Sequence, residues 1–149
     1  MTITATRSWK SYNTLCSMLQ KNDIPFERDD EDLRVCCCVS SGEKERLFVF
    51  ETDPSKMLIT LKCELPFSPD TDVLPDIAIG CAVINNELEC GGFCLDIAER
   101  RIYYRMTASF YESSRSRGVF EYMLSSAADA ADRFCPKLEK MILAGADMF

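Results

Sequence analysis

Three strand-like stretches, separated by very short connectors, constrain the fold of this chain more than any other feature of its sequence. They run from Leu33 to Ser40, from Arg46 to Thr52 and from Lys56 to Leu65, and the connectors between them are "SGEKE" and "DPS". Connectors of this length are typical of hairpins, whereas parallel neighbours need a crossover of a dozen or more residues. The sequence therefore predicts three consecutive antiparallel strands.

Six further apolar residues predict a hairpin around residue 100. They alternate with more polar positions on either side of the turn "AERR": Phe93, Leu95, Ile97, Ile102, Tyr104 and Met106. If the turn centres on Glu99 and Arg100, residue 97 lies opposite 102 and residue 95 opposite 104. The six apolar side chains then share one face, and Asp96 and Arg105 lie as diagonal neighbours on the other. That pair is either a substrate clamp or an ordinary ion pair across two strands.

Segments with helical periodicity lie before, between and after these groups of strands. Apolar residues three and four positions apart predict a helix from Ser8 to Lys21, with Ser8 as its N-cap, and a second helix that begins near Asp72. A long helix from Phe120 to Phe134 follows the second hairpin, and Pro136 opens a further short helix that ends at Gly145. The stretch "NDIPFERDDED" interrupts the periodicity with a proline and several acids, so it is predicted to be a loop.

The resulting order, α-β-β-β-α-β-β-α(α), predicts an α+β fold with a five-stranded, mainly antiparallel sheet packed against helices. We expect residues 1–149 to form a single domain, because a chain of this length supplies one core and shows no repeat, linker or low-complexity tract.

Apolar residues occupy both faces of the second and third strands. One set is Phe48, Phe50 and Leu58, and the other is Leu47, Val49, Ile59 and Leu61. Whichever set faces the core, apolar side chains remain on the opposite face. An exposed apolar patch on a small protein usually marks an interface, and a two-fold dimer is the commonest way to cover one. The sequence therefore predicts self-association through the sheet and the middle helix.

The charge and the amino end limit the partners. The formal net charge of −7 disfavours nucleic acid, which needs a basic face. The first residues, "MTITATRSWKSYNTL", lack the apolar run of a signal peptide, and no segment has the roughly 20 apolar residues of a membrane span. We expect a cytoplasmic protein that binds neither nucleic acid nor membrane.

Nine cysteines, three of them adjacent in "RVCCCVSS", are the chemically most conspicuous residues. On a strand Cys36 and Cys38 point to one face and Cys37 to the other, so the three cannot ligate one metal, and Cys36 and Cys38 are poorly placed for a disulfide. The remaining cysteines lack the paired short spacings of a zinc site. The sequence predicts reduced, largely packed thiols, with no metal site and no cofactor.

Catalytic motifs are also missing from the sequence. The chain has no histidine to serve as a base, no serine in a G-x-S-x-G turn, and a "GG" that follows a helix rather than a strand. We therefore expect no enzymatic activity.

The stretch "INNELECGGFCLDIAERRIYYR" resembles the YbjN family of bacterial sensory transduction regulators. The matching positions are Asn85 or Asn86, Gly92, Phe93, Asp96, Tyr104 and Arg105. Trp9, "IPFERD" and "DRFCPKLEKMI" agree with the same family, so the resemblance covers almost the whole chain. It implies the fold of type III secretion chaperones, and it implies that the matching positions are partner-binding or motif residues.

Two functional hypotheses follow. The resemblance implies a non-catalytic protein-binding module, chaperone-like or regulatory, that acts as a homodimer and holds a segment of a partner protein. The alternative is a small-molecule or redox sensor that uses exposed cysteines such as Cys36, Cys38 or Cys94. Reactivity of the native thiols would separate the two.

Overall fold

The described residues of the computed structural model, 3–41, 44–111 and 115–144, form three helices, one short 3-10 helix and six strands. The elements in chain order are α1 (Ile3–Lys21), β1 (Phe26–Asp29), β2 (Arg34–Ser41), β3 (Lys44–Asp53), β4 (Leu58–Glu64), η1 (Thr71–Val73), α2 (Leu74–Glu87), β5 (Gly92–Asp96), β6 (Arg101–Ser109) and α3 (Arg117–Ala144). The predicted α+β class and element order are confirmed, with one strand more than expected.

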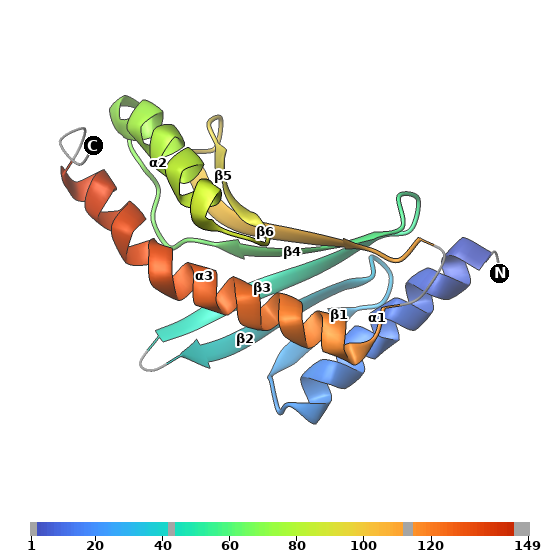
Figure 1. The fold of residues 1–149 in the computed structure, drawn as a ribbon. Helices are drawn as coiled ribbons and strands as arrows, with labels where there is room; N and C mark the ends of the chain where they lie inside the picture. Colours follow the sequence, from blue (N-terminus) through green and yellow to red (C-terminus); the bar gives the residue numbers. More distant parts are fainter. Residues whose placement is uncertain (1–2, 42–43, 112–114, 145–149) are drawn as a thin grey trace.

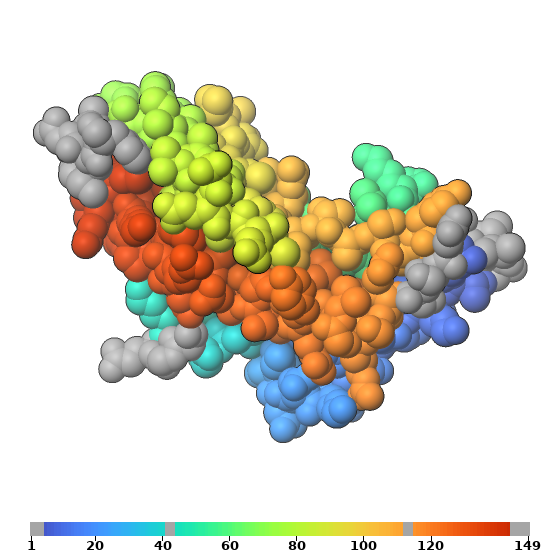
Figure 2. All heavy atoms as spheres, in the orientation of Figure 1, coloured from blue at the N-terminus to red at the C-terminus, as the bar shows by residue number. Residues whose placement is uncertain are grey.

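All six strands form one antiparallel sheet in the order β1-β2-β3-β4-β6-β5. Helix α3 runs across the sheet, with α2 beside the β5–β6 hairpin and α1 at the end where α3 begins (Figure 1). Atoms of α2 and α3 dominate this side of the molecule, and strand atoms emerge at its margins (Figure 2). The helices and the sheet therefore form two layers.

Large apolar side chains fill the space between the layers. Phe48, Phe50, Ile59 and Leu61 are fully buried on the helical side of β3 and β4, and the Phe50 ring meets the edge of Phe120 from α3 at 6.4 Å between centroids. Phe50 is paired with Leu61 across the two strands. The predicted grouping of Phe48 and Phe50 with Leu58 is therefore wrong. The prediction placed three residues in the β3–β4 turn, whereas the turn has four, and one extra residue moves the next strand to the opposite face.

Three of the hairpins close with the same turn. An aspartate ends the first strand, four residues follow, and the residue that pairs with the aspartate is five positions later: Asp29 with Arg34, Asp53 with Leu58, and Asp96 with Arg101. Each carboxylate accepts at least one backbone N–H from within its turn, at 3.0–3.2 Å. The last turn residue has a left-handed φ each time, 51° to 54°, at Leu33, Met57 and Arg100.

This turn corrects the predicted register of the β5–β6 hairpin. Leu95 lies opposite Ile102 and Phe93 opposite Tyr104, because the turn comprises residues 97–100. Ile97 is therefore a turn residue, 66% exposed, and does not join the buried face. Since the register changes by two positions, the other apolar residues of the hairpin keep the predicted face.

Three other predictions about secondary structure need correction. Helix α1 begins at Ile3, so Ser8 lies inside it and is buried rather than an N-cap. The predicted loop contains β1, whose acidic composition concealed a strand. Helix α3 continues through Pro136, because Phe134, Leu138 and Met141 stay buried on one side of it and their packing outweighs the lost hydrogen bond. Gly145 lies outside the described residues.

Candidate protein-binding surfaces

The face of the sheet opposite the helices, here called the open face, has no described helix packed on it. Its residues alternate with the buried ones along each strand. They include Glu27, Arg34, Cys36, Cys38, Glu45, Leu47, Val49, Glu51, Leu58, Thr60, Lys62, Glu64, Cys94, Asp96, Arg101, Tyr103, Arg105 and Thr107. The prediction that apolar side chains remain on a second face is confirmed, since Leu47 is 59% exposed and Val49 half-buried.

Charged and polar pairs surround these apolar residues. The Arg101 guanidinium lies 3.0 Å from the Glu64 carboxylate, and the Lys62 ammonium lies 5.5 Å from the centre of the Tyr103 ring. Partial burial, followed by the nearby Cys94, raises the pKa of the Tyr103 hydroxyl. Such exposed pairs contribute little to stability, so they are available for contacts with a partner.

A hollow of about 560 Å³ lies on the open face. It is lined by Arg34, Leu47, Val49, Glu51, Lys62, Glu64, Asp96, Glu99, Arg101 and Tyr103. The lining therefore combines two aliphatic side chains and one aromatic ring with carboxylates and cations. This mixture suits a protein segment better than a phosphate backbone, which needs cations alone.

Helix α2 carries a second uncovered apolar surface, here called the outer face of α2. Its core side, with Ile77, Cys81 and Ile84, is buried against the sheet and α3. On the other side Ile79 is 54% and Val83 50% exposed. Ala78 and Ala82 are exposed beside them, and residues 77–86 contain no charge. A solvated helix face normally carries charged side chains, so this surface is unusual.

The residues predicted from the family motif divide into two groups. Asn85, at the end of α2, accepts a hydrogen bond from the Phe93 N–H at 2.7 Å and donates one to the Phe93 C=O at 3.0 Å. Its side-chain amide thereby occupies the free edge of β5, in the manner of a neighbouring strand. Phe93 is buried against Tyr104 and Phe134.

Tyr104 and two glycines pack closely around Asn85 and Phe93. The Tyr104 hydroxyl donates to the Cys90 C=O at 2.7 Å, and burial raises its pKa to about 12. A Cβ at Gly91, which has φ +69°, would lie 2.3 Å from that hydroxyl, and one at Gly92 would lie 3.2 Å from Asn85. Of the predicted residues, Asn85, Gly92, Phe93 and Tyr104 thus meet in one cluster whose contacts join α2 to the β5–β6 hairpin.

Asn86, Asp96 and Arg105 do not join that cluster. Asn86 is exposed on α2. Asp96 ends β5 and accepts the Glu99 N–H at 3.1 Å, which is the turn contact described above. Arg105 lies opposite Gly92, four positions along the strand from the partner of Asp96. The predicted diagonal pairing of Asp96 with Arg105 is therefore wrong, and a role for these residues in partner binding stays a prediction.

The cysteines follow the strand alternation that the sequence predicts. Cys37 is buried among the core residues, and its burial raises the pKa of the thiol to about 12. Cys36 and Cys38 are half-buried on the open face. Among the described residues, no group of three or more His, Cys, Asp or Glu side chains is arranged to hold a metal ion.

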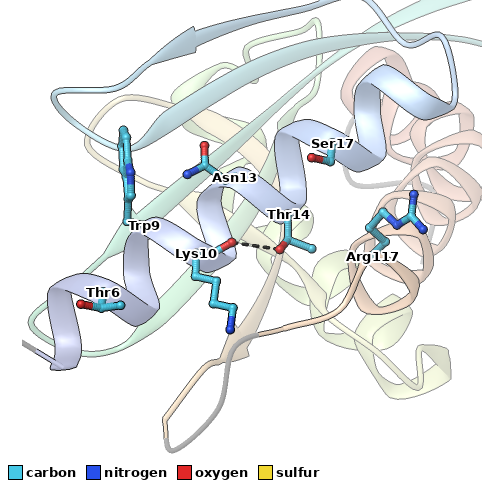
Figure 3. A pocket seen from close by; sticks show the side chains of 7 residues that line it. All are labelled: Thr6, Trp9, Lys10, Asn13, Thr14, Ser17 and Arg117. Atoms are coloured by element: carbon cyan, nitrogen blue, oxygen red, sulfur yellow. Dashed lines mark hydrogen bonds between the residues drawn. The ribbon is translucent and has the colours of Figure 1, made fainter.

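A separate hollow of about 610 Å³ follows the outside of α1 (Figure 3). Its lining residues are Thr6, Trp9, Lys10, Asn13, Thr14, Ser17 and Arg117. All but Arg117 come from α1, and Trp9 and Lys10 extend in different directions from the helix. The Trp9 ring stacks on Tyr12, which anchors it to the core. This hollow brings together no group of reactive side chains.

The family assignment follows from a sequence comparison over most of the chain. A family model, YbjN, described as "Putative bacterial sensory transduction regulator", matches residues 11–140. The chain belongs to the YbjN family. The corner formed by Asn85, Gly92, Phe93 and Tyr104 lies inside the matched range. No curated protein matches the chain in a second comparison.

Solved structures share the fold at low sequence identity. A chain of the ExsC–ExsE complex matches with a TM-score of 0.64 and 16% identity, over 93% of this chain and 97% of that one. YbjN from E. coli gives 0.60 and 11%, over 80% and 84%. A chain of the HopA1–SchA chaperone–effector complex gives 0.58 and 12%, over 84% and 91%. This chain therefore has the fold of type III secretion chaperones.

None of the helices in the described part of the chain combines the length and the apolar character needed to cross a lipid bilayer.

Proposed function

We propose that this YbjN-family protein is a non-catalytic, chaperone-like or regulatory protein-binding module of the cytoplasm that acts as a homodimer. The observation that carries the proposal is the open face, where Leu47 and Val49 lie exposed or half-buried among charges of both signs. The fold similarity to chains of a chaperone–effector complex and of the ExsC–ExsE complex supports it. All nine cysteines are free thiols, as is usual in a reducing compartment.

The two uncovered surfaces have different roles in this proposal. The open face takes a segment of a partner protein, because its mixed lining offers both apolar contact and polar recognition. The outer face of α2 pairs with the same face of a second copy, because a two-fold axis covers two identical apolar stripes at once. The small side chains of Ala78 and Ala82 let two such helices approach closely, beside Ile79 and Val83.

Light scattering after size exclusion tests the homodimer. We expect the mass of two chains for the native protein at micromolar concentration and of one chain for Ile79→Asp/Val83→Asp. Leu143→Asp is the matched control, since Leu143 is an exposed apolar residue on α3. A mass of one chain at every concentration of the native protein would remove the homodimer from the proposal.

Affinity capture from the native host tests the open face. We expect a protein that is retained by the native chain and by Leu143→Asp but not by Leu47→Asp/Val49→Asp. Circular dichroism and urea unfolding confirm that each variant is folded. Equal capture by the open-face variant would place the partner elsewhere on the molecule.

A further inference from the structure

Cys36 and Cys38 form a pair of thiols on one uncovered surface. Both lie on the open face of β2, two positions apart, while Cys37 between them is buried. Across β3 they face Val49 and Leu47, and across β1 Cys36 faces Glu27. No described helix covers them. Two half-buried thiols therefore project side by side from one strand into solvent.

Their spacing excludes one reaction and favours another. Residues two apart on a strand have Cα atoms about 6.7 Å apart and parallel Cβ directions. A disulfide needs Cβ atoms about 3.5–4.5 Å apart, so these thiols do not bridge each other. A cation bound in line between two sulfurs, with metal–sulfur bonds of about 2.3 Å as in zinc thiolates, spans about 4.6 Å. The sulfur atoms must therefore lie closer together than the Cα atoms, which requires each Cβ–Sγ bond to tilt towards the other.

The available donors select the kind of cation. Zinc prefers four ligands in a tetrahedron, and the described residues offer no set of three or more. Thiolates are soft ligands that prefer Cu(I). The Cys38 thiol donates a hydrogen bond to Glu45 Oε2, with 3.9 Å between sulfur and oxygen, and carboxylate oxygen is a ligand suited to harder cations.

We propose that Cys36 and Cys38 form a two-coordinate binding site for Cu(I). On binding, each thiol loses its proton to water and each sulfur donates an electron pair to the metal, so one Cu(I) replaces two protons. The occupied pair carries a net charge of −1. Arg34, the preceding residue of β2 on the same face, supplies a positive charge beside it, whereas Glu27 opposite Cys36 and Glu45 next to Cys38 add negative charge. The sequence predicts no metal site, so this two-ligand site departs from that prediction.

Anaerobic titration of the reduced protein with Cu(I), against a chromophoric Cu(I) chelator as competitor, tests the site. We expect one Cu(I) per chain to be held against the competitor. Cys36→Ser and Cys38→Ser should each weaken binding by about a hundredfold or more, the upper end of what loss of a merely supporting residue does. Cys94→Ser, a half-buried thiol at the far edge of the same face, should bind as the native protein does.

A second variant tests the spacing rather than the number of thiols. Cys38→Ser/Ser40→Cys keeps two cysteines on the same face of β2 but places their Cα atoms about 13 Å apart. We expect this variant to bind as weakly as Cys36→Ser. Native-like binding by the respaced variant, or by Cys36→Ser/Cys38→Ser, would overturn the site. Because the titration needs no partner protein, its outcome is independent of the proposed function.

Discussion

The two faces of the sheet are built from the same strands, yet adjacent residues experience different surroundings. On the helical face Phe48, Phe50 and Tyr104 are fully buried. On the open face Leu47 is 59% exposed, one position from Phe48. Substitutions on the helical face should therefore change stability, and those on the open face should change binding. This comparison separates residues that stabilise the fold from residues that are exposed for binding.

The sharpest form of the comparison lies within β2. Because burial raises the pKa of the Cys37 thiol from 9 to about 12, its thiolate fraction near pH 8 falls about a thousandfold. We expect an aromatic disulfide reagent to label Cys36 and Cys38 in the native protein far faster than Cys37, because Cys37 is buried and its thiol stays protonated. Mass spectrometry of peptides labelled over time measures the rates. Equal rates for Cys36 and Cys37 would remove the distinction between the faces.

On the helical face, Phe93→Ala should lower the free energy of unfolding by about 3–5 kcal/mol, because it leaves a cavity beside Tyr104 and Phe134. Urea unfolding followed by circular dichroism measures the loss. Leu47→Ala on the open face is the control, with an expected change within about 0.5 kcal/mol. A loss below one kcal/mol for Phe93→Ala would contradict its burial.

The edge of the sheet offers an intermediate case with a matched control. Asn85→Ala should cost about 2 kcal/mol, because it leaves the Phe93 N–H and C=O without their partner. Asn86→Ala, one residue later and exposed, should change the unfolding free energy by a few tenths of a kcal/mol. Urea unfolding of the two variants side by side measures both losses of unfolding free energy. Similar losses would contradict the assignment of Asn85 as the asparagine of the family motif.

A more gradual effect is expected in alkaline solution. Because the pKa of Tyr104 is raised to about 12, the unfolded chain loses this proton at lower pH than the folded one. Its contribution to stability is complete below pH 10 and is lost as the pH rises towards 12, by at most about 1.4 kcal/mol per pH unit. Tyr104→Phe should reduce this slope. Buried thiols titrate in the same range, so the difference between native and variant is the quantity to measure. The same dependence of unfolding free energy on pH in the native protein and in Tyr104→Phe would contradict the raised pKa of Tyr104.

The sequence predicts the fold where periodicity is strong and fails where turn chemistry decides. Alternation placed Cys36, Cys37 and Cys38 on the observed sides of β2. The β5–β6 register was predicted wrongly because the turn was centred on Glu99 and Arg100, one residue later than its actual centre. The aspartate at position 96 carried the missing information, since Asp29 and Asp53 precede turns of the same length.

The candidate surfaces were predictable only in part. Exposed apolar residues on the sheet were expected, but the face they occupy depends on the length of the β3–β4 turn. The spacing of Ile77, Cys81 and Ile84 indicates the buried side of α2 correctly, but the apolar character of its outer face was not predicted. The signal that could have found it is the absence of charge from residues 77–86. The sequence could not distinguish Asn85 from Asn86, because it does not show which of the two side chains faces β5 at the end of α2.

The repeated turn closes three separate hairpins of this protein in the same way. Residues 30–33, 54–57 and 97–100 each span the gap between an aspartate and the residue five positions later. The three turns therefore share a backbone geometry, although Leu33 and Met57 also pack against the core. The turn at 54–57 is distant in sequence from both the Asn85 corner and the helix α2. It is thus a natural point at which to insert a fluorescent reporter or an affinity handle into the chain.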